Sequence, residues 1–453
     1  MRTAISLSSL CLLMAILAPA QAARDGRNER SANQASRTPV RNVIFLLGDG
    51  MGYSEITIAR NYYYGAAGHL EMDGLPYTGS ATTYSLSEKD PSKPDYVTDS
   101  AASATGWATG AKTSNGRLAT APQTNAALKT ILELAREKGF KTGNVTTAEI
   151  VDATPAALAS HISRRGCFGP AEMKDCPTEK KSEGGLGSIA EQMVEHNIDV
   201  MLGGGRKRFQ GIIDGGPYAN KTVLQEAEQL GYQIVSTSAE LSAVQPGSRK
   251  VLGLFNDGNM SLEWSGDLAI PYPGSGPQTC QEFVRPLNEP GLPFMTLKAL
   301  QLLQREGSGP GFFLQVEGAQ IDKRDHFANP CEQIGETIAF DNAIKIALDF
   351  ARARKDTLVI VTADHSHTSQ IIPVPTMEYH PAGLVSTLVT ADKTNMAINY
   401  ATNSVCCSRE QNMEHTGAQV RVAAYGPMAE QVSGHHDMTD LYHLMAKALG
   451  LEQ

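Results

Sequence analysis

Carboxylates and imidazoles follow three short apolar runs of the sequence, the pattern expected of a metal site assembled at one edge of a β-sheet. The runs, rich in Val, Ile, Leu and Phe, lie at 43–47, 312–316 and 358–363 and predict buried central strands. The C-terminal ends of parallel strands meet at the edge where open α/β sheets bind ligands. The candidate ligands at these ends are Asp49, Glu317, Asp322, His326, Asp364, His365 and His367. We therefore expect a metal site built across the sheet.

A serine that could act as a nucleophile lies in Asp99-Ser100, which opens a run of small residues up to Thr105. This pattern predicts a helix N-terminus, where backbone N–H groups and the helix dipole favour an anion. A free serine is a weak nucleophile and needs a base or a metal ion for activation. Because the chain has no G-x-S-x-G motif, activation by a metal ion is expected. The alternative is a helix cap with no chemical role.

The rest of the chain alternates strand-like and helix-like segments. Strands are predicted at 141–146, 199–202 and 421–425, and helices at 125–138 and 337–353. This alternation is typical of an α/β fold, in which a doubly wound, mostly parallel central sheet carries helices on both faces. The interval of about 367–415 interrupts the alternation and is interpreted as an insertion.

Length and composition indicate one large globular domain of the size of an enzyme. The chain has 453 residues, of which 41% are hydrophobic and 19% are charged, and its formal net charge is −9. Nothing in this acidic balance indicates a nucleic-acid partner. A protein of this charge that handles anions needs local positive charge from metal ions or from a suitably placed arginine.

The N-terminus has the features of a cleavable export signal. Arg2 supplies a positive charge, residues 4–17 are mainly apolar, and residues 20–22 form an Ala-Gln-Ala cleavage motif. We expect residues 1–22 to be removed, 23–41 to form a flexible polar leader, and 42–453 to form the catalytic domain. The apolar stretch is too short for a membrane span and contains serines, so no membrane anchor is expected.

Six cysteines remain after removal of the export signal, and an exported chain meets an oxidising compartment. Cys167 and Cys176 bracket a loop that contains Gly and Pro, and we expect them to pair locally. Cys280 and Cys331 form the expected long-range disulfide. The adjacent cysteines at 406–407 either form a strained vicinal disulfide or remain as free or intermolecular thiols. No C-x-x-C pair is present, so a zinc site made by cysteines is not expected.

Six motifs, in their order along the chain, resemble those of alkaline phosphatases, specifically the bacterial periplasmic type. They are Gly48-Asp49-Gly50-Met51-Gly52, Tyr96-Val97-Thr98-Asp99-Ser100-Ala101-Ala102-Ser103, Asp152-Ala153-Thr154-Pro155, Val316-Glu317-Gly318 leading to Asp322-Lys323-Arg324-Asp325-His326, Thr362-Ala363-Asp364-His365, and Glu414-His415-Thr416-Gly417. The resemblance extends over residues 43–426. It implies hydrolysis of phosphate monoesters in the periplasm by a homodimer, with the insertion forming a small crown beside the dimer interface.

The resemblance also implies two zinc ions and one magnesium ion. The implied ligands are Asp322, His326 and His415 for the first zinc ion; Asp49, Asp364 and His365 for the second; and Asp49, Thr154 and Glu317 for magnesium, with Asp152 holding that ion through water. Sets that contain histidine suit zinc, and a set of oxygens suits magnesium. The resemblance also implies residues that orient the ligands or the substrate without binding a metal ion directly: Asp99, Lys323, Asp325 and His367.

In the implied mechanism Ser100 attacks phosphorus, forms a phosphoserine as the alcohol leaves, and is regenerated by hydrolysis. Arg165 would bind two phosphate oxygens, for which a planar guanidinium is suited, and only the motif selects it over the adjacent Arg164. Lys323 would contact phosphate through water. Some relatives carry histidine in place of Asp152 and Lys323, so this pair indicates magnesium at the third site.

Two other functions remain open at this stage. A phosphodiesterase of the same superfamily usually has a threonine nucleophile and lacks the clamp that Arg165 would form. A catalytically silent zinc- or phosphate-binding protein would lack Ser100 or a ligand. The C/S-x-P-x-R context of sulfatases is absent, and phosphoglycerate mutases of this superfamily are cytosolic. The histidines for which no metal role is expected are His69, His161, His196, His380, His435, His436 and His443.

Overall fold

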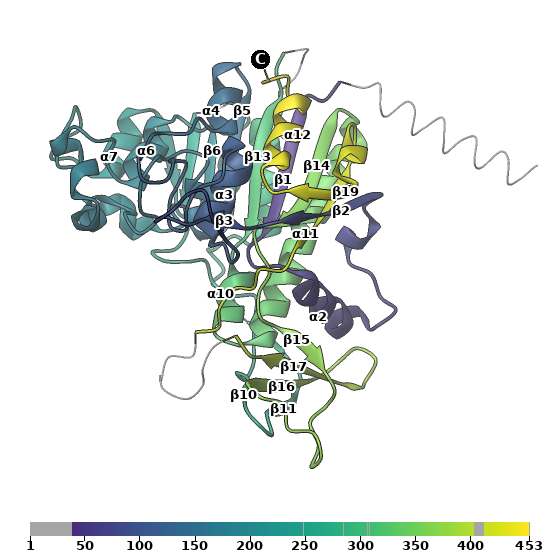
Figure 1. The fold of residues 1–453 in the computed structure, drawn as a ribbon. Helices are drawn as coiled ribbons and strands as arrows, with labels where there is room; N and C mark the ends of the chain where they lie inside the picture. Colours follow the sequence, from purple (N-terminus) through teal and green to yellow (C-terminus); the bar gives the residue numbers. More distant parts are fainter. Residues whose placement is uncertain are drawn as a thin grey trace, which may run out of the picture.

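The computed structural model describes residues 39–452 except 248, 284, 306, 308 and 403–411, and its centre is a ten-stranded sheet (Figure 1). Across the sheet the order is β19 (Gly434–Asp437), β2 (Tyr77–Thr82), β18 (Val420–Tyr425), β14 (Thr357–Ala363), β1 (Asn42–Gly48), β13 (Phe312–Gly318), β5 (Lys141–Glu149), β6 (Val200–Gly204), β8 (Lys250–Leu254) and β7 (Tyr232–Val235). All neighbours from β14 to β7 are parallel, and β18 runs against both of its neighbours. The predicted mostly parallel sheet is confirmed.

Helices cover both faces of this sheet. The α-helices are α2 (Tyr53–Tyr64), α3 (Ser100–Thr109), α4 (Ile131–Glu137), α5 (Ala153–Ala156), α6 (Ile189–Glu195), α7 (Val223–Gln229), α8 (Ser238–Ala243), α9 (Leu292–Leu303), α10 (Gln320–His326), α11 (Pro330–Arg354) and α12 (Asp440–Ala448). The register of β1 and β13 shows which side chains lie on each face of the central sheet. Phe45 of β1 pairs with Gln315 of β13, and both contact Trp107 of α3. Because side chains alternate along a strand, Gly318 lies on the other face, where it meets Phe340 of α11.

The central strands are buried because they are covered from both sides. Every residue of β1, β13 and β14 is buried, in agreement with the three apolar runs from which these strands were predicted. Helix α3 is also almost wholly buried, since it consists of small residues around Trp107 and can approach the sheet closely. The rigid part of the fold therefore lies directly beneath the strand ends that carry the candidate ligands.

A second, smaller sheet projects away from the central one, below α2 and α10 in Figure 1. Its strands are β15 (Gln370–Ile372), β16 (Leu384–Val389) and β17 (Asn395–Tyr400), joined by β10 (Ile270–Pro271) and β11 (Ser275–Gln278). The interval 367–415 supplies the first three of these strands, whereas β10 and β11 come from a separate segment that lies outside the expected insertion. The remaining short elements are β3 (Ser85–Leu86), β4 (Pro94–Asp95), β9 (Trp264–Ser265), β12 (Gln281–Glu282), η1 (Glu71–Gly74), η2 (Pro170–Asp175), η3 (Pro177–Glu179), η4 (Lys181–Glu183), η5 (Arg206–Gln210) and η6 (Ala429–Val432).

The helix predicted at 125–138 is wrong in its first half. Residues 119–128 form a turn in which Thr120 and Ala127 pair as a β-bridge, and Asn125 has a positive φ of 55°. Helix α4 begins at Ile131, after Thr130, which forms a capping box with Glu133. The predicted helix at 337–353 is part of the longer α11, because Asn329 caps a helix whose first residue is a proline.

Both predicted disulfides are present in the structure. Cys167 and Cys176 are joined across the loop that they bracket, and Cys280 and Cys331 join the segment after β11 to the first turn of α11. Residues 406 and 407 lie outside the described residues. Among the described helices, none has both the length and the apolar character required to cross a bilayer.

Candidate metal centre

Three neighbouring strands bring the predicted acidic and histidine residues to one edge of the sheet. Asp49 follows β1, Glu317 is the penultimate residue of β13, and Asp364 follows β14. Strand β1 lies between the other two in a matched parallel register, so the three strands end side by side. Helix α10 starts directly after β13 and presents Asp322 and His326 one turn apart.

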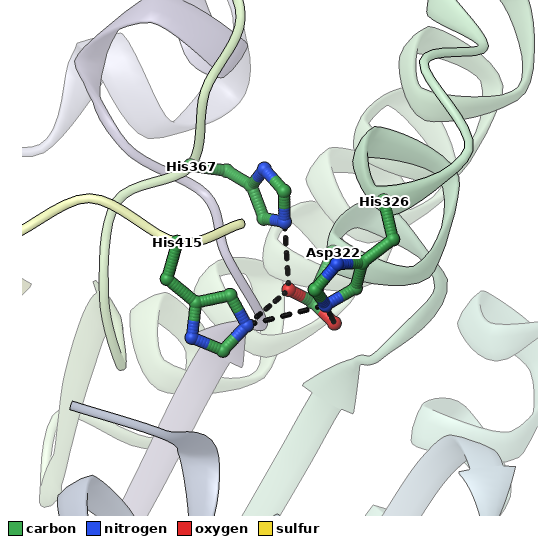
Figure 2. Close-up of side chains that lie close together, drawn as sticks. All are labelled: Asp322, His326, His367 and His415. Atoms are coloured by element: carbon green, nitrogen blue, oxygen red, sulfur yellow. Dashed lines mark hydrogen bonds and ion pairs between the residues drawn. The ribbon is translucent and has the colours of Figure 1, made fainter. Parts of the chain in front are cut away.

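The first cluster consists of Asp322, His326, His367 and His415, which converge from α10 and from two loops (Figure 2). Asp322 lies at its centre. Its Oδ1 is 3.3 Å from Nε2 of both His367 and His415, and its Oδ2 is 3.4 Å from Nε2 of His326. The Nε2 atoms of His326 and His415 are 3.2 Å apart. Two imidazole nitrogens that face each other beside a carboxylate at these distances could share one cation.

Backbone carbonyls determine which nitrogen of His326 and His415 faces the centre of the cluster. Nδ1 of His326 donates to the carbonyl of Met413, and Nδ1 of His415 donates to the carbonyl of Thr98 at 3.0 Å. In the neutral rings both Nε2 lone pairs then point toward Asp322. Metal-ligating histidines are generally fixed in this way by a hydrogen bond from the nitrogen that does not bind the ion.

His367 has the opposite tautomer. Its Nδ1 accepts the backbone N–H of Thr368 at 2.9 Å, so its Nε2 carries the proton and faces Asp322. Burial lowers the pKa of His367 to about 4, which keeps the ring neutral. Burial acts against the charge of His415 as well, but the Asp322 carboxylate outweighs it and raises the pKa of His415 to about 9. His367 therefore presents a donor to the carboxylate and not a lone pair to a cation.

The second cluster consists of Asp49, Asp364 and His365. Nε2 of His365 is 3.3 Å from Oδ2 of Asp364 and 3.5 Å from Oδ1 of Asp49. The predicted nucleophile lies against it: Oγ of Ser100 is 3.4 Å from both Asp49 Oδ1 and His365 Nε2. Ser100 is the first residue of α3, and Asp99 caps that helix by accepting the N–H of Ala102 at 2.9 Å. The structure thus places the serine at a helix N-terminus, as predicted, and beside the second cluster.

Negative charge accumulates in the second cluster. Oδ1 of Asp364 accepts the N–H groups of Gly50 and His365 at 2.9 Å, but its Oδ2 is buried without a hydrogen-bond partner among the described residues. Burial and the charge of Asp49 raise the pKa of Asp364 well above its ordinary value. Burial and the charge of Asp322 raise the pKa of Asp49 to about 6. A divalent cation between these groups would offset the repulsion, so the residues fit a metal site.

Oxygen-bearing side chains also lie on β13 and on α5, two elements that contact each other. Glu317 is buried, and its Oε2 accepts the hydroxyl of Thr146 at 2.5 Å. Burial and the charge of Asp49 raise the pKa of Glu317 to about 8. The hydroxyl of Thr154, at the start of α5, is buried without a hydrogen-bond partner among the described residues. Hard oxygen ligands of this kind fit Mg²⁺.

Arg165 lies at the site, and Arg164 is exposed. The guanidinium of Arg165 donates to Asp99 Oδ2 at 3.1 Å and to Asp152 Oδ1 at 3.0 Å. Lys323 donates to the other oxygen of Asp152 at 2.8 Å. Burial acts against these cations, but Asp152 and its neighbours hold the pKa values of Arg165 and Lys323 well above their ordinary values. Two fixed positive charges are therefore available for an anion.

Two further buried residues bear on how the ligands are oriented. Asp325 is fully buried, but neither of its carboxylate oxygens has a hydrogen-bond partner among the described residues. Burial and the charge of Glu55 raise its pKa well above the ordinary value. Conversely, Thr146 was not singled out, although it donates to Glu317. The signal is the pairing of Thr146 with Glu317 across β5 and β13, which requires the strand order.

Comparison with known proteins supports the family resemblance of the six motifs over most of the chain. The sequence profile of the family described as alkaline phosphatase matches residues 40–411 and 385–451. An alkaline phosphatase of Escherichia fergusonii is 49% identical over 448 residues, which cover 96% of this chain and 92% of that protein. A streptomycin-6-phosphate phosphatase of Streptomyces griseus is 47% identical over 447 residues, 97% of this chain and 96% of that protein.

Solved structures agree with the sequence matches. The alkaline phosphatase of the Antarctic bacterium TAB5 superposes with a TM-score of 0.68 at 27% identity, covering 92% of this chain and 99% of that one. A histidine-to-aspartate variant of the same enzyme is described with magnesium bound in its M3 site. The α/β sheet, the buried serine and the adjoining carboxylate and histidine clusters define a hydrolase with metal-binding clusters. The chain belongs to the alkaline phosphatase family, and its activity is that of a phosphomonoesterase.

Proposed function

We propose that the protein hydrolyses phosphate monoesters to an alcohol and inorganic phosphate through a phosphoserine at Ser100. One observation carries this proposal: Oγ of Ser100 lies 3.4 Å from both Asp49 Oδ1 and His365 Nε2. The serine hydroxyl therefore borders directly on side chains that can bind a metal ion. Serine needs such activation, because its hydroxyl is a weak nucleophile at neutral pH.

We further propose two zinc ions and one magnesium ion as the cofactors. The proposed ligands are Asp322, His326 and His415 for one zinc ion, Asp49, Asp364 and His365 for the other, and Asp49, Thr154 and Glu317 for magnesium, with Asp152 acting through water. The lone pairs of His326 and His415 and the unpartnered oxygens of Asp364 and Thr154 support this distribution. The magnesium described in the TAB5 variant supports the third ion. When bound, such ions stabilise the charge on the attacking and leaving oxygens.

The protein's own groups would act on the phosphoryl group as follows. The N-terminus of α3 directs backbone N–H groups and its dipole toward the anion that Ser100 attacks. Arg165, held by Asp99 and Asp152, would donate to two non-bridging phosphate oxygens. Lys323 would add positive charge through a water molecule. In-line displacement transfers the phosphoryl group from the alcohol oxygen to Ser100 Oγ, and hydrolysis then regenerates the serine.

The test is hydrolysis of p-nitrophenyl phosphate before and after chelation, and again after zinc and magnesium are restored. We expect loss of activity on chelation and recovery only with both metals. Streptomycin 6-phosphate, the ester in the name of the Streptomyces griseus relative, belongs in the same substrate panel. Preference for bis-p-nitrophenyl phosphate would instead favour a phosphodiesterase. Tight zinc or phosphate binding with no turnover by the folded, metal-loaded protein would favour a silent binding protein.

We also propose that the chain is exported to the periplasm and acts as a homodimer. Residues 1–22 would be removed as a signal peptide, 23–41 would form a leader, and 42–453 would form the catalytic domain with its insertion at about 367–415. Sequencing of the N-terminus of protein from the periplasmic fraction tests the cleavage, which is expected after Ala22. Light scattering coupled to gel filtration tests the dimer, and the mass of a single chain would exclude it.

A further inference from the structure

A second group of histidines meets a carboxylate outside the candidate metal centre. Glu133 lies in the first turn of α4, His161 lies after α5, and His196 caps the C-terminus of α6. Oε1 of Glu133 is 3.3 Å from Nε2 of His161 and 3.1 Å from Nε2 of His196. We call these three residues the outer cluster. Both histidines were expected from the sequence to have no metal role.

The donors and acceptors of the outer cluster leave a gap that a cation would fill. Nδ1 of His161 donates to the carbonyl of Ala119 at 2.9 Å, and Nδ1 of His196 donates to the carbonyl of Gln192 at 2.7 Å. In neutral rings both Nε2 lone pairs therefore face Oε1 of Glu133, an acceptor that cannot satisfy them. Both Nε2 atoms could donate a hydrogen bond to Oε1 only if both rings were protonated, which would place two imidazolium ions on one carboxylate oxygen.

Burial and preorganisation strengthen this argument. The side chains of His161, His196 and Glu133 are 8%, 20% and 19% exposed. Oε2 of Glu133 already accepts the backbone N–H of Thr130 at 2.8 Å, so the carboxylate is held with Oε1 toward the imidazoles. Burial acts against ionisation of Glu133, but the nearby rings of His161 and His196 and the N–H of Thr130 outweigh it and keep the pKa of this carboxyl well below its ordinary value. The carboxylate is therefore charged at neutral pH.

We propose that Glu133, His161 and His196 bind a transition-metal ion of the zinc class, at a site separate from the three ions of the candidate metal centre. Two nitrogen lone pairs and one carboxylate oxygen form a common set of protein ligands for zinc, and solvent can complete a tetrahedron. Ligands about 2.0–2.1 Å from a tetrahedral ion lie roughly 3.3 Å apart, close to both nitrogen–oxygen separations. The hydrogen bonds from Nδ1 to backbone carbonyls fix the tautomer and the orientation of both rings, as is general for histidines that bind a metal ion.

The position of the outer cluster indicates what the ion would do. His161 precedes Arg165 by four residues on the same segment, and Ile162 between them pairs with Leu118. An ion in the outer cluster would join this segment to α4 and α6. It would therefore brace the segment that carries Arg165 without touching the phosphoryl group. The proposal does not depend on the proposed metals or mechanism of the candidate metal centre.

The direct test is a crystal of the holoenzyme grown with zinc and measured at the zinc absorption edge. We expect an anomalous-difference peak about 2.0–2.2 Å from Glu133 Oε1 and from Nε2 of His161 and His196. Absence of this peak in crystals whose catalytic ions give clear peaks would overturn the proposal. It would leave the outer cluster as a hydrogen-bonded group that shares protons.

Metal content measured by mass spectrometry gives an independent test in solution. After saturation with zinc and magnesium and removal of free metal, we expect His161→Gln, His196→Gln and Glu133→Gln to retain one zinc equivalent fewer than the wild type. Glutamine at 133 can still close the capping box with Thr130, so this variant changes the ligand with little effect on the helix. The matched control is His69→Gln, at an exposed histidine, and should bind as much zinc as the wild type. Equal zinc in all five proteins would also overturn the proposal.

Discussion

The candidate metal centre and the outer cluster both place histidines against a carboxylate, but they differ in charge balance. In the centre, Asp49, Asp364 and Glu317 are buried near other carboxylates, and burial together with repulsion by those carboxylates raises their pKa values. In the outer cluster a single carboxylate, Glu133, faces two imidazoles and has an ordinary partner in Thr130. The centre therefore carries an excess of negative charge that several cations would offset, whereas the outer cluster has one carboxylate and two ring nitrogens, which a single cation would match.

The two regions also differ in what holds their side chains. The ligands of the centre follow β1, β13 and β14, which are buried along their whole length. The outer cluster is held by the ends of two short helices and by a loop. Strand ends in a covered sheet resist movement more than helix ends near the surface do. We therefore expect the centre to keep its geometry, and the outer cluster to gain more order from a bound ion.

The largest expected effect is that of Ser100→Ala, which removes the proposed nucleophile and leaves the clusters intact. Turnover of p-nitrophenyl phosphate should fall on the order of 10³-fold or more, as is typical when a nucleophile is deleted. Rapid acid quenching with radiolabelled phosphate should show a phosphoenzyme in the wild type and none in the variant. Ser92→Ala, in an exposed loop, is the control and should behave as the wild type. Near-native turnover of Ser100→Ala would exclude Ser100 as the nucleophile.

Removal of the metals should make the stability of the protein depend on pH between about 4 and 8. The folded-state pKa values of Asp49 and Glu317 are raised to about 6 and about 8 in the absence of ions. For groups with raised pKa values the folded state holds more protons, so their stabilising contribution is complete below the unfolded-state pKa near 4 and is lost as pH rises through the folded-state values. A group contributes roughly 1.4 kcal/mol to the free energy of unfolding for every tenfold difference in its proton affinity between the folded and the unfolded state.

The measurement is the free energy of unfolding in urea, with and without chelator, across this pH range. Other buried acids titrate in both forms: burial and the charge of Glu263 raise the pKa of Glu336 to about 8. The difference in the free energy of unfolding between the chelated and the metal-loaded protein therefore reports the contribution of the metal centre alone. If the chelated and the metal-loaded proteins lost stability in parallel, the excess negative charge would not be the feature that distinguishes the centre from the outer cluster.

A smaller effect is expected from Thr146→Val, which removes the hydroxyl that donates to Glu317. Loss of a group that orients a metal ligand typically lowers metal affinity about 10- to 100-fold. Magnesium activation curves should shift to higher concentration by that factor. Thr142→Val is the matched control, because Thr142 is buried on the same strand and its hydroxyl has no hydrogen-bond partner among the described residues. Equal shifts in both variants would assign the effect to packing.

The difference between the two regions also explains what the sequence could predict. The strands beside Asp49, Glu317 and Asp364 were predictable because a buried parallel strand is a continuous apolar run, and the polar residue after it marks the sheet edge. The family's ordered motifs then indicated His415, which comes from a distant loop. The reversed direction of β18 was not predictable from its local pattern, since strand direction follows from pairing.

The outer cluster was invisible in the sequence because its residues carry no joint local signal. Glu133 belongs to a capping-box pattern, and His161 and His196 are lone histidines on separate segments. The expected helix at 125–138 hid the site further, since it placed Glu133 in the interior of a helix. Only the tertiary fold, which brings an end of α4, an end of α6 and the loop after α5 near one another, places the three side chains together. Motifs with local periodicity can be detected in one sequence. A site formed by the ends of two helices and by a loop can be recognised only when the tertiary structure is known.

The smallest expected effect is that of His196→Gln on thermal unfolding. At a zinc concentration about 100 times the dissociation constant of the outer cluster, binding would add roughly 2.7 kcal/mol, or on the order of 3 °C for a chain of this length. The variant should lack this increment with excess zinc and should unfold near the wild-type temperature when all metals are chelated. His69→Gln should retain the full increment. A variant that lost the same amount of stability in chelator as in zinc would show that His196 stabilises α6 through its hydrogen bonds alone, and the two regions would then differ in kind: one a metal site, the other a helix cap.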